Sequence, residues 1–128
     1  MTVAPIDLSA SALRLHHDGR IRAETRTGDP GHDGWRLTAF HVKTDADVHD
    51  GDWQVHPEAE EVVSCLIGKI RLLLRPERPG REEQITLTAG TAAIVPRGRW
   101  HRIALVTPST IMAVTLPRGG RPERGTDA

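Results

Sequence analysis

The feature that most constrains this chain is a series of short apolar segments that begins at Trp53. They read "WQVH", "EEVVSCLIG", "KIRLLLR", "QITLTA", "TAAIVP", "HRIALVT" and "TIMAVTL", with Pro, Gly or polar residues between most of them. Segments this short and this rich in Val, Ile, Leu and Thr are typical of β-strands. No part of the chain carries an apolar stripe at helical spacing. Many short strands at close spacing predict an all-β domain, either a sandwich or a barrel.

The flanking segments set the expected boundaries. The stretch "LRLHHDGRIRAETRTG" predicts a hairpin around Asp18-Gly19, and "WRLTAFHV" alternates as a further strand. After Leu116 no hydrophobic residue anchors the chain, so its end is expected to fray. At 128 residues the chain is long enough for one domain. We therefore expect an N-terminal extension and hairpin over 1–34, a barrel over 35–116 and a flexible tail over 117–128.

Composition excludes several classes of partner. With 17 basic and 17 acidic residues, no net charge attracts nucleic acid or an anionic membrane. One phenylalanine, three tryptophans and no tyrosine leave little surface for stacking bases. No stretch approaches the roughly 18 apolar residues of a membrane span, and the N-terminus lacks a signal-peptide pattern. The single cysteine, Cys65, lies in an apolar run, which fits a buried thiol in a reducing compartment. We expect a cytoplasmic protein that binds neither nucleic acid nor membrane.

Two histidine stretches stand out against this background. In "WQVHPEAEE" the side chains of Gln54 and His56 share one face of a strand, and Pro57 then ends that strand. Glu60 and Glu61 begin the next strand on opposite faces, so only one of them can point inward. In "VPRGRWH" a Pro-x-Gly turn leads into a strand that begins at His101. Imidazoles, a carboxylate and an amide oxygen form a mixed donor set that suits Zn, Mn, Fe or Ni.

These residues resemble the two signature motifs of the cupins, a family of small β-barrel proteins. In the first motif, His-x-His is followed by three or four residues, Glu, six residues and Gly. His56, Glu61 and Gly68 fit this spacing, which selects Glu61 over Glu60. The second motif runs Gly, five residues, Pro-x-Gly, two residues and His. Its four defined positions are Gly90, Pro96, Gly98 and His101. The resemblance covers roughly residues 35 to 116.

The resemblance implies a single-domain jelly-roll barrel with a divalent transition metal near its mouth. It implies His56, Glu61 and His101 as ligands with Gln54 in support, and a homodimer, because small cupins commonly pair. It does not imply one reaction, because cupins include several kinds of enzyme as well as noncatalytic binding modules.

Three positions depart from the cupin pattern. Gln54 stands where the first motif has its first histidine, Val48 where it has its opening glycine, and Leu105 where the second motif closes on asparagine. The change at Gln54 matters most, because an amide oxygen is a weaker donor than imidazole. Gln54 is then either a weak fourth ligand or a hydrogen-bonding partner of a ligated water or a bound substrate.

Other residues complete the predicted site. Glu60 and His41 are the candidate proton shuttles. Arg97, Arg99 and Arg102 are expected to form a solvated rim around the His101 turn. A set of inward apolar side chains is predicted to line the pocket floor, which suits a small, partly apolar ligand: Val63, Cys65, Ile103, Leu105 and Met112.

Two functional hypotheses follow from this site. The first is a metal-dependent enzyme acting on a small organic molecule, of the dioxygenase, isomerase, cyclase or decarboxylase type. The second is a noncatalytic cupin that binds a metal or a small ligand as a sensor or accessory protein. The weakened ligand set keeps the second hypothesis open.

Overall fold

A computed structural model describes residues 3–26, 33–48, 52–76, 79–116 and 121–123 of the chain. Within these ranges no helix is long and apolar enough to cross a membrane. The described elements are eleven strands and one turn of 3-10 helix: β1 (Ser11–Leu15), β2 (Ile21–Thr25), β3 (Trp35–Val42), η1 (Asp45–Asp47), β4 (Trp53–Val55), β5 (Glu61–Ile67), β6 (Lys69–Leu74), β7 (Glu83–Thr88), β8 (Thr91–Val95), β9 (His101–Leu105), β10 (Ser109–Thr115) and β11 (Arg121–Glu123).

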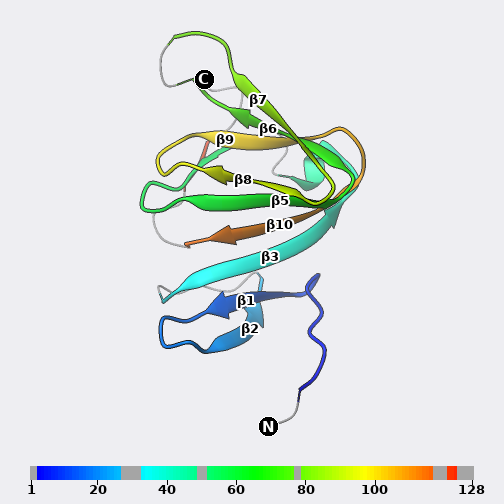
Figure 1. The fold of residues 1–128 in the computed structure, drawn as a ribbon, viewed down its shortest axis with the longest axis vertical. Coiled ribbons are helices and arrows are strands. Elements are labelled where there is room, and N and C mark those ends of the chain that lie inside the picture. Colours follow the sequence, from blue (N-terminus) through cyan, green and yellow to red (C-terminus); the bar gives the residue numbers. More distant parts are fainter. Residues whose placement is uncertain (1–2, 27–32, 49–51, 77–78, 117–120, 124–128) are drawn as a thin grey trace.

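The strands form two antiparallel sheets (Figure 1). The larger sheet has the order β2-β1-β3-β10-β5-β8, and the smaller sheet has the order β11-β4-β9-β6-β7. Sequence neighbours such as β5 and β6 lie in different sheets, so the chain crosses between the sheets repeatedly, as in a jelly roll. The prediction of an all-β, jelly-roll domain is confirmed.

The hydrophobic core lies between the sheets. Val63, Cys65 and Ile111 enter it from the larger sheet, and Ile70 and Leu72 enter it from the smaller one. All five are almost fully buried, with at most 1% of their surface exposed. Each of these strands places alternate side chains on its inner face, so the two rows of branched residues pack against each other without a helix to cover either sheet.

The N-terminal hairpin is part of the larger sheet. β1 pairs with β2 around the Asp18-Gly19 turn, and it also pairs with β3, where Leu13 lies opposite Leu37. Figure 1 shows the hairpin extending the sheet beyond the barrel. At the other end, β11 pairs with β4. Most of the predicted tail, residues 117–120 and 124–128, lies outside the described residues.

Two of the five predicted pocket-floor residues, Val63 and Ile103, line the cavity. Cys65 lies in the core, Leu105 packs against it, and Met112 lies on the other face of β10. β10 alternates regularly and pairs with β3 without a break, so Ile111 and Ala113 share its inner face. Met112 lies on the opposite side of β10, between Ala39 and Ser64 of the neighbouring strands. Both faces of β10 carry apolar residues, so alternation alone does not show which face is the inner one.

Gly68 forms the corner at which the chain passes from β5 to β6. Its φ of +93° lies in the left-handed region, and an added Cβ would lie 2.5 Å from the carbonyl oxygen of Pro108 and 2.4 Å from Oγ of Ser109. The hydroxyl of Ser109 accepts a hydrogen bond from the backbone N–H of Lys69 and donates to the carbonyl of Thr107. The corner therefore requires a residue without a side chain.

Candidate metal centre

Three of the four predicted ligands meet at one point of the barrel. His56 directly follows β4, Glu61 is the first residue of β5, and His101 is the first residue of β9. Nε2 of His101 lies 2.7 Å from Oε1 of Glu61, and Nε2 of His56 lies 3.4 Å from Oε2 of the same carboxylate. All three side chains offer a ligand atom within 4.8 Å of the other two. The structure thus joins two imidazoles and one carboxylate in a group that can hold an ion.

Backbone contacts between the two motif stretches hold this arrangement. The N–H of Gly98 in the Pro-x-Gly turn donates to the carbonyl of His56 at 2.9 Å, with Gly98 at a φ of +77°. β4 pairs with β9 at a single position, where Gln54 lies opposite His101. The turn and this pair therefore fix His56 and His101 relative to each other, although 45 positions separate them in the sequence.

The Glu61 carboxylate and the His101 imidazole shift each other's pKa. Burial alone raises the pKa of Glu61, but the neighbouring imidazoles of His101 and His56 outweigh it and lower that pKa from 4.5 to about 2. For His101, burial lowers the pKa, but the Glu61 carboxylate and the Arg99 carbonyl raise it above its usual value. The centre therefore favours an ionised glutamate beside a positive charge.

The hydrogen bonds of the two histidines fit a metal-ligating role. Nδ1 of His101 lies 3.1 Å from the carbonyl of Arg99, so we assign Nδ1 as the donor, which leaves Nε2 directed at Glu61. The Nε2–Oε1 contact is close but lacks the alignment of a hydrogen bond, and both ring nitrogens of His56 are buried without a hydrogen-bond partner among the described residues. Buried polar atoms left open in this way need a ligand. A divalent transition metal such as Zn, Mn, Fe or Ni suits these donors.

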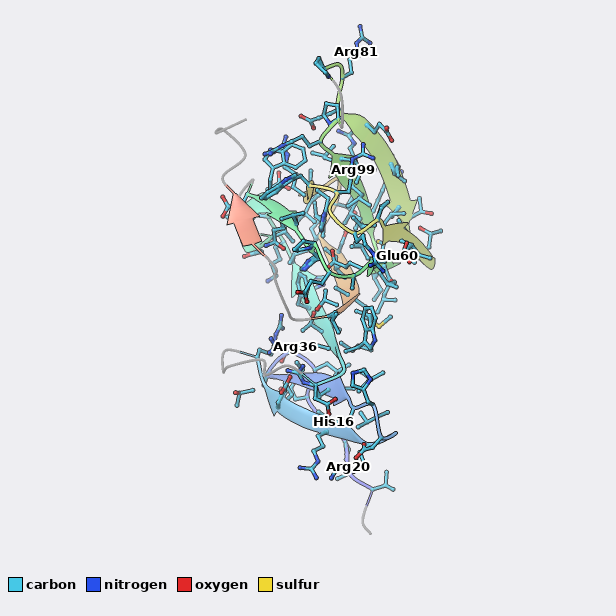
Figure 2. All side chains as sticks on the ribbon, turned by 90° about the vertical axis from the view of Figure 1, so that its left-hand side faces the viewer. His16, Arg20, Arg36, Glu60, Arg81 and Arg99 are labelled. Atoms are coloured by element: carbon cyan, nitrogen blue, oxygen red, sulfur yellow. The ribbon has the colours of Figure 1, made fainter. Side chains whose placement is uncertain are left out.

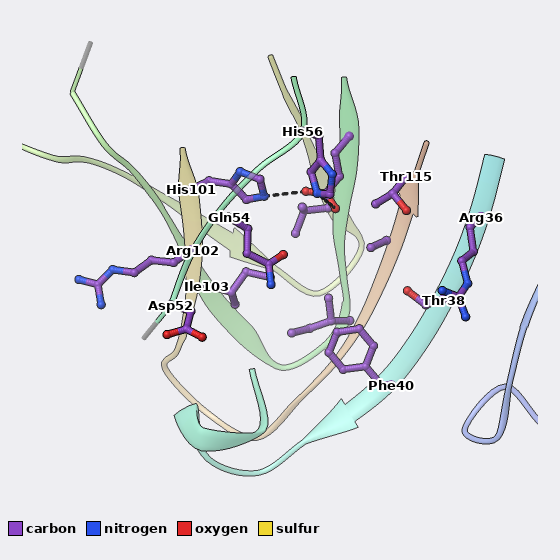
Figure 3. Close-up of a pocket in the computed structure, with 14 residues that line it drawn as sticks. Arg36, Thr38, Phe40, Asp52, Gln54, His56, His101, Arg102, Ile103 and Thr115 are labelled. Atoms are coloured by element: carbon purple, nitrogen blue, oxygen red, sulfur yellow. Dashed lines mark ion pairs between the residues drawn. The ribbon is translucent and has the colours of Figure 1, made fainter. Parts of the chain in front are cut away.

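The centre lies at one side of a cavity of about 290 Å³ (Figure 3). Gln54, the fourth predicted ligand, is half-buried and lines this cavity beside His101. Whether its amide ligates an ion or bonds to a ligand stays a prediction. Five apolar side chains form much of the remaining wall: Phe40, Val63, Ile103, Ile111 and Ala113. A cavity with apolar walls and a few convergent polar groups is typical of a site for small molecules.

Two charged residues of the cavity were not found from the sequence. Arg36 lines it from β3, on the same face as Thr38 and Phe40, and Asp52 lines it two residues before Gln54. Strand alternation places Arg36 with Phe40 and Asp52 with Gln54, so the signal was present in the pattern. A period of two alone, however, does not say which face of β3 is the inner one.

Neither predicted proton shuttle lines the cavity. Glu60 is exposed just before β5, and His41 is exposed on β3, where its Nδ1 lies 3.0 Å from Oγ1 of Thr110 in the neighbouring strand. Phe40, the residue before His41, points into the cavity instead. The structure places Glu60 and His41 outside the cavity. Their role in proton transfer stays a prediction.

Arginine side chains stack on Trp53 and Trp100, the residues that precede Gln54 and His101 in the sequence. The Arg75 guanidinium lies 4.9 Å from the ring centre of Trp53 and 5.0 Å from that of Trp100. Arg102 also stacks on Trp53, at 4.9 Å. Cation–π contacts of this kind stabilise the packing. Of the predicted solvated rim, only Arg97 is exposed. Arg99 (Figure 2) is 12% exposed and donates from Nε to the carbonyl of Arg75, and Arg102 packs on Trp53 and lines the cavity.

Comparison with known proteins identifies the fold. No protein-family model matches the sequence, and no curated protein matches it either. Among solved structures, a cupin-2 domain containing protein from Shewanella frigidimarina matches with a TM-score of 0.50 and 20% identity, over 70% of this chain and 74% of that one. The chain has the cupin fold.

Two further cupin-fold neighbours are larger proteins with named metals. An oxalate decarboxylase from Bacillus subtilis, described with Mn(II) centres, matches with a TM-score of 0.53 and 16% identity, over 68% of this chain and 23% of that one. HppE, described with FeII, matches with a TM-score of 0.51 and 18% identity, over 63% of this chain and 42% of that one. At these identities the neighbours show the fold and leave the activity open.

Proposed function

We propose that this protein is a metal-dependent cupin enzyme that acts on a small, partly apolar organic substrate, with a reaction of the dioxygenase, isomerase, cyclase or decarboxylase type. The observation that carries the proposal is the convergence of His56, Glu61 and His101 at one side of an apolar cavity, with the ring nitrogens of His56 lacking a hydrogen-bond partner among the described residues. Cupin-fold neighbours whose descriptions name Mn(II) and FeII support this assignment.

Each residue of the centre has a separate part in this proposal. His56, Glu61 and His101 would hold the ion, and a bound divalent ion supplies Lewis-acid chemistry by polarising a donor atom of the substrate. Gln54 would orient the substrate from beside His101 through its amide. Asp52, a second carboxylate of the cavity wall, is the candidate that accepts or returns a proton at its side-chain oxygens. The apolar wall would exclude water from the bound substrate.

Metal analysis of purified protein tests the proposal. We expect the wild-type chain to hold close to one divalent ion per chain, and His56→Ala and His101→Ala to lose it while circular dichroism shows an intact fold. His17→Ala is the matched control, because His17 is 69% exposed on the hairpin and lies far from the centre along the chain. Wild-type protein that takes up none of Zn, Mn, Fe or Ni would refute the metal centre.

The noncatalytic alternative rests on Gln54. A neutral amide in place of an imidazole weakens the ligand set, and a ligand-binding sensor tolerates a weaker site than an enzyme does. Stability distinguishes the two functions. A chain that stays metal-free, keeps its melting temperature in chelator and still binds small molecules would favour the sensor over the enzyme.

A further inference from the structure

The guanidinium group of Arg36 lies across the cavity from Asp52. Arg36 sits on β3, and its side chain is only 14% exposed. It shares the inner face of that strand with Thr38 and Phe40, and all three line the cavity. Figure 3 shows Arg36 beside Thr38, on the opposite side of the cavity from Asp52 and Arg102.

The N-terminal hairpin holds Arg36 in place. Nη2 of Arg36 donates to the carbonyl of Arg26 at 2.8 Å and to that of Thr25 at 3.1 Å, both at the end of β2. Nε of Arg36 lies 3.4 Å from Oε1 of Glu24 on the same strand, without hydrogen-bond geometry. These contacts fix the side chain, so little conformational freedom remains to be lost when a ligand binds.

The charges around Arg36 do not balance among the described residues. Glu24 is shared, because its Oε1 also accepts a hydrogen bond at 2.8 Å from Nη2 of Arg14, a residue that is only 3% exposed. Two guanidinium groups therefore face one carboxylate. A largely buried positive charge without a full counter-charge is costly, and an anion in the adjacent cavity would offset that cost.

We propose that Arg36 binds the carboxylate of the substrate, whose other end reaches the centre formed by His56, Glu61 and His101. This inference deepens the proposed function and relies on it for the orientation of the substrate toward the ion. A guanidinium fork matches a carboxylate in shape and charge. Phe40 and Ile111 line the same cavity and would contact the hydrocarbon between the two ends. The substrate class is then a small organic acid with an apolar middle.

Arg102, the other arginine of the cavity, is less suited to this role. Its guanidinium stacks on Trp53 and lies 3.7 Å from Glu82. In Figure 3 its head group points away from Gln54 and His101. Arg102 therefore has partners outside the cavity. Among the described residues, the one carboxylate near Arg36 is that of Glu24, which Arg36 shares with Arg14.

Binding of benzoate and benzamide to the full chain tests the inference. The two probes have the same ring, and only benzoate carries a charge. Chelator-treated protein is titrated by calorimetry, so that no ion competes for the carboxylate. We expect benzoate to bind about 10- to 100-fold more tightly than benzamide, the scale of a charge-assisted hydrogen-bonded pair. Equal affinities, or no binding of either probe, would overturn the inference.

Three variants locate the effect. Arg36→Gln should abolish the preference for benzoate, and Arg71→Gln, which removes an exposed arginine of β6, should keep it. Glu24→Gln should strengthen benzoate binding, because it removes the carboxylate that competes for Arg36. The substitutions at Arg36 and Glu24 should change the affinity for benzoate in opposite directions, which distinguishes anion binding from general damage to the hairpin. A preference that survives in Arg36→Gln, or an affinity that falls in well-folded Glu24→Gln, would contradict the assignment.

Metal uptake by the same variants, measured on portions that have not been treated with chelator, keeps the two proposals separate. Arg36→Gln should retain the wild-type metal content, since Arg36 is not among the proposed ligands. A chain that takes up no metal but shows the Arg36-dependent preference would refute the metal centre alone. A chain that takes up metal but shows no such preference would refute the carboxylate site alone.

Discussion

Replacing Glu61 by glutamine in the metal-free chain tests the electrostatics of the centre directly. Glutamine has nearly the same shape as glutamate but cannot carry the negative charge that faces His101 at 2.7 Å. The pKa of Glu61 is lowered from 4.5 to about 2 in the folded chain. A folded-state pKa below the unfolded one means that the ionised carboxylate stabilises the fold.

The size of this stabilisation follows from the pKa shift. Its slope with pH has opposite signs at the two ends of the pH range. The ionised carboxylate contributes about 3 kcal/mol near pH 5.5 and about 2 kcal/mol near pH 3.5, because the unfolded chain takes up its proton first. At the other end, the raised pKa of His101 contributes stability that is complete below its usual value of 6.5 and is lost as pH rises through the raised value. The difference between wild type and Glu61→Gln should therefore peak at mildly acidic pH.

Urea unfolding in chelator, followed by circular dichroism from about pH 3.5 to about pH 8, measures this difference. Glu60→Gln is the matched control, because Glu60 precedes Glu61 in the sequence but is exposed. Its free energy of unfolding should differ from that of wild type by a small and nearly constant amount. If the curve for Glu61→Gln were as flat as that for Glu60→Gln, the carboxylate would not be coupled to the histidines as described here.

Two further substitutions test the ligand set and the frame that supports it. Gln54→His should tighten metal binding by about tenfold, the scale on which changes around a metal act; an unchanged or weaker affinity in a metal titration would show that Gln54 is not a weakened ligand. Gly68→Ala should lower the free energy of unfolding by about 1–3 kcal/mol more than Gly90→Ala, as measured in urea. Both glycines have positive φ, but an added Cβ meets Ser109 and Pro108 at Gly68 and open space at Gly90. Equal losses would show that the corner can relax.

The residues that converge at the centre could be predicted from the sequence, because short turns govern the spacing within each motif. His56 directly follows one strand and Glu61 begins the next, so a short turn brings the acid toward the imidazole. The Pro-x-Gly turn then requires a positive φ at Gly98 and sets where the strand of His101 begins. Residue types and short intervals within each stretch can be read locally. The contacts that join the two stretches, from Gly98 to His56 and from Gln54 to His101, are long-range, and the resemblance to the cupin motifs predicts them.

The inner face of each strand is harder to predict, because register decides it. On β10, alternation separates Ile111 from Met112, but "STIMAVT" carries apolar residues on both faces, and pairing with β3 and β5 decides that Ile111 faces inward. On β3, alternation separates Arg36 and Phe40 from His41, but both faces carry apolar residues. Which set faces the cavity depends on pairing with β10 and β1.

Motif spacing positions the residues proposed to bind the metal, and strand register positions the residue proposed to select the substrate. The residues that would hold a metal begin or directly follow β4, β5 and β9, within the part of the chain that resembles the cupin motifs. Arg36 lies on β3 and is fixed by Thr25 and Arg26 of the hairpin, which precedes the first motif. A chain that kept both motifs but changed the hairpin would keep the donor set and lose the positive charge opposite it. Substrate choice in this protein is therefore expected to follow the N-terminal hairpin, and metal choice the two motifs.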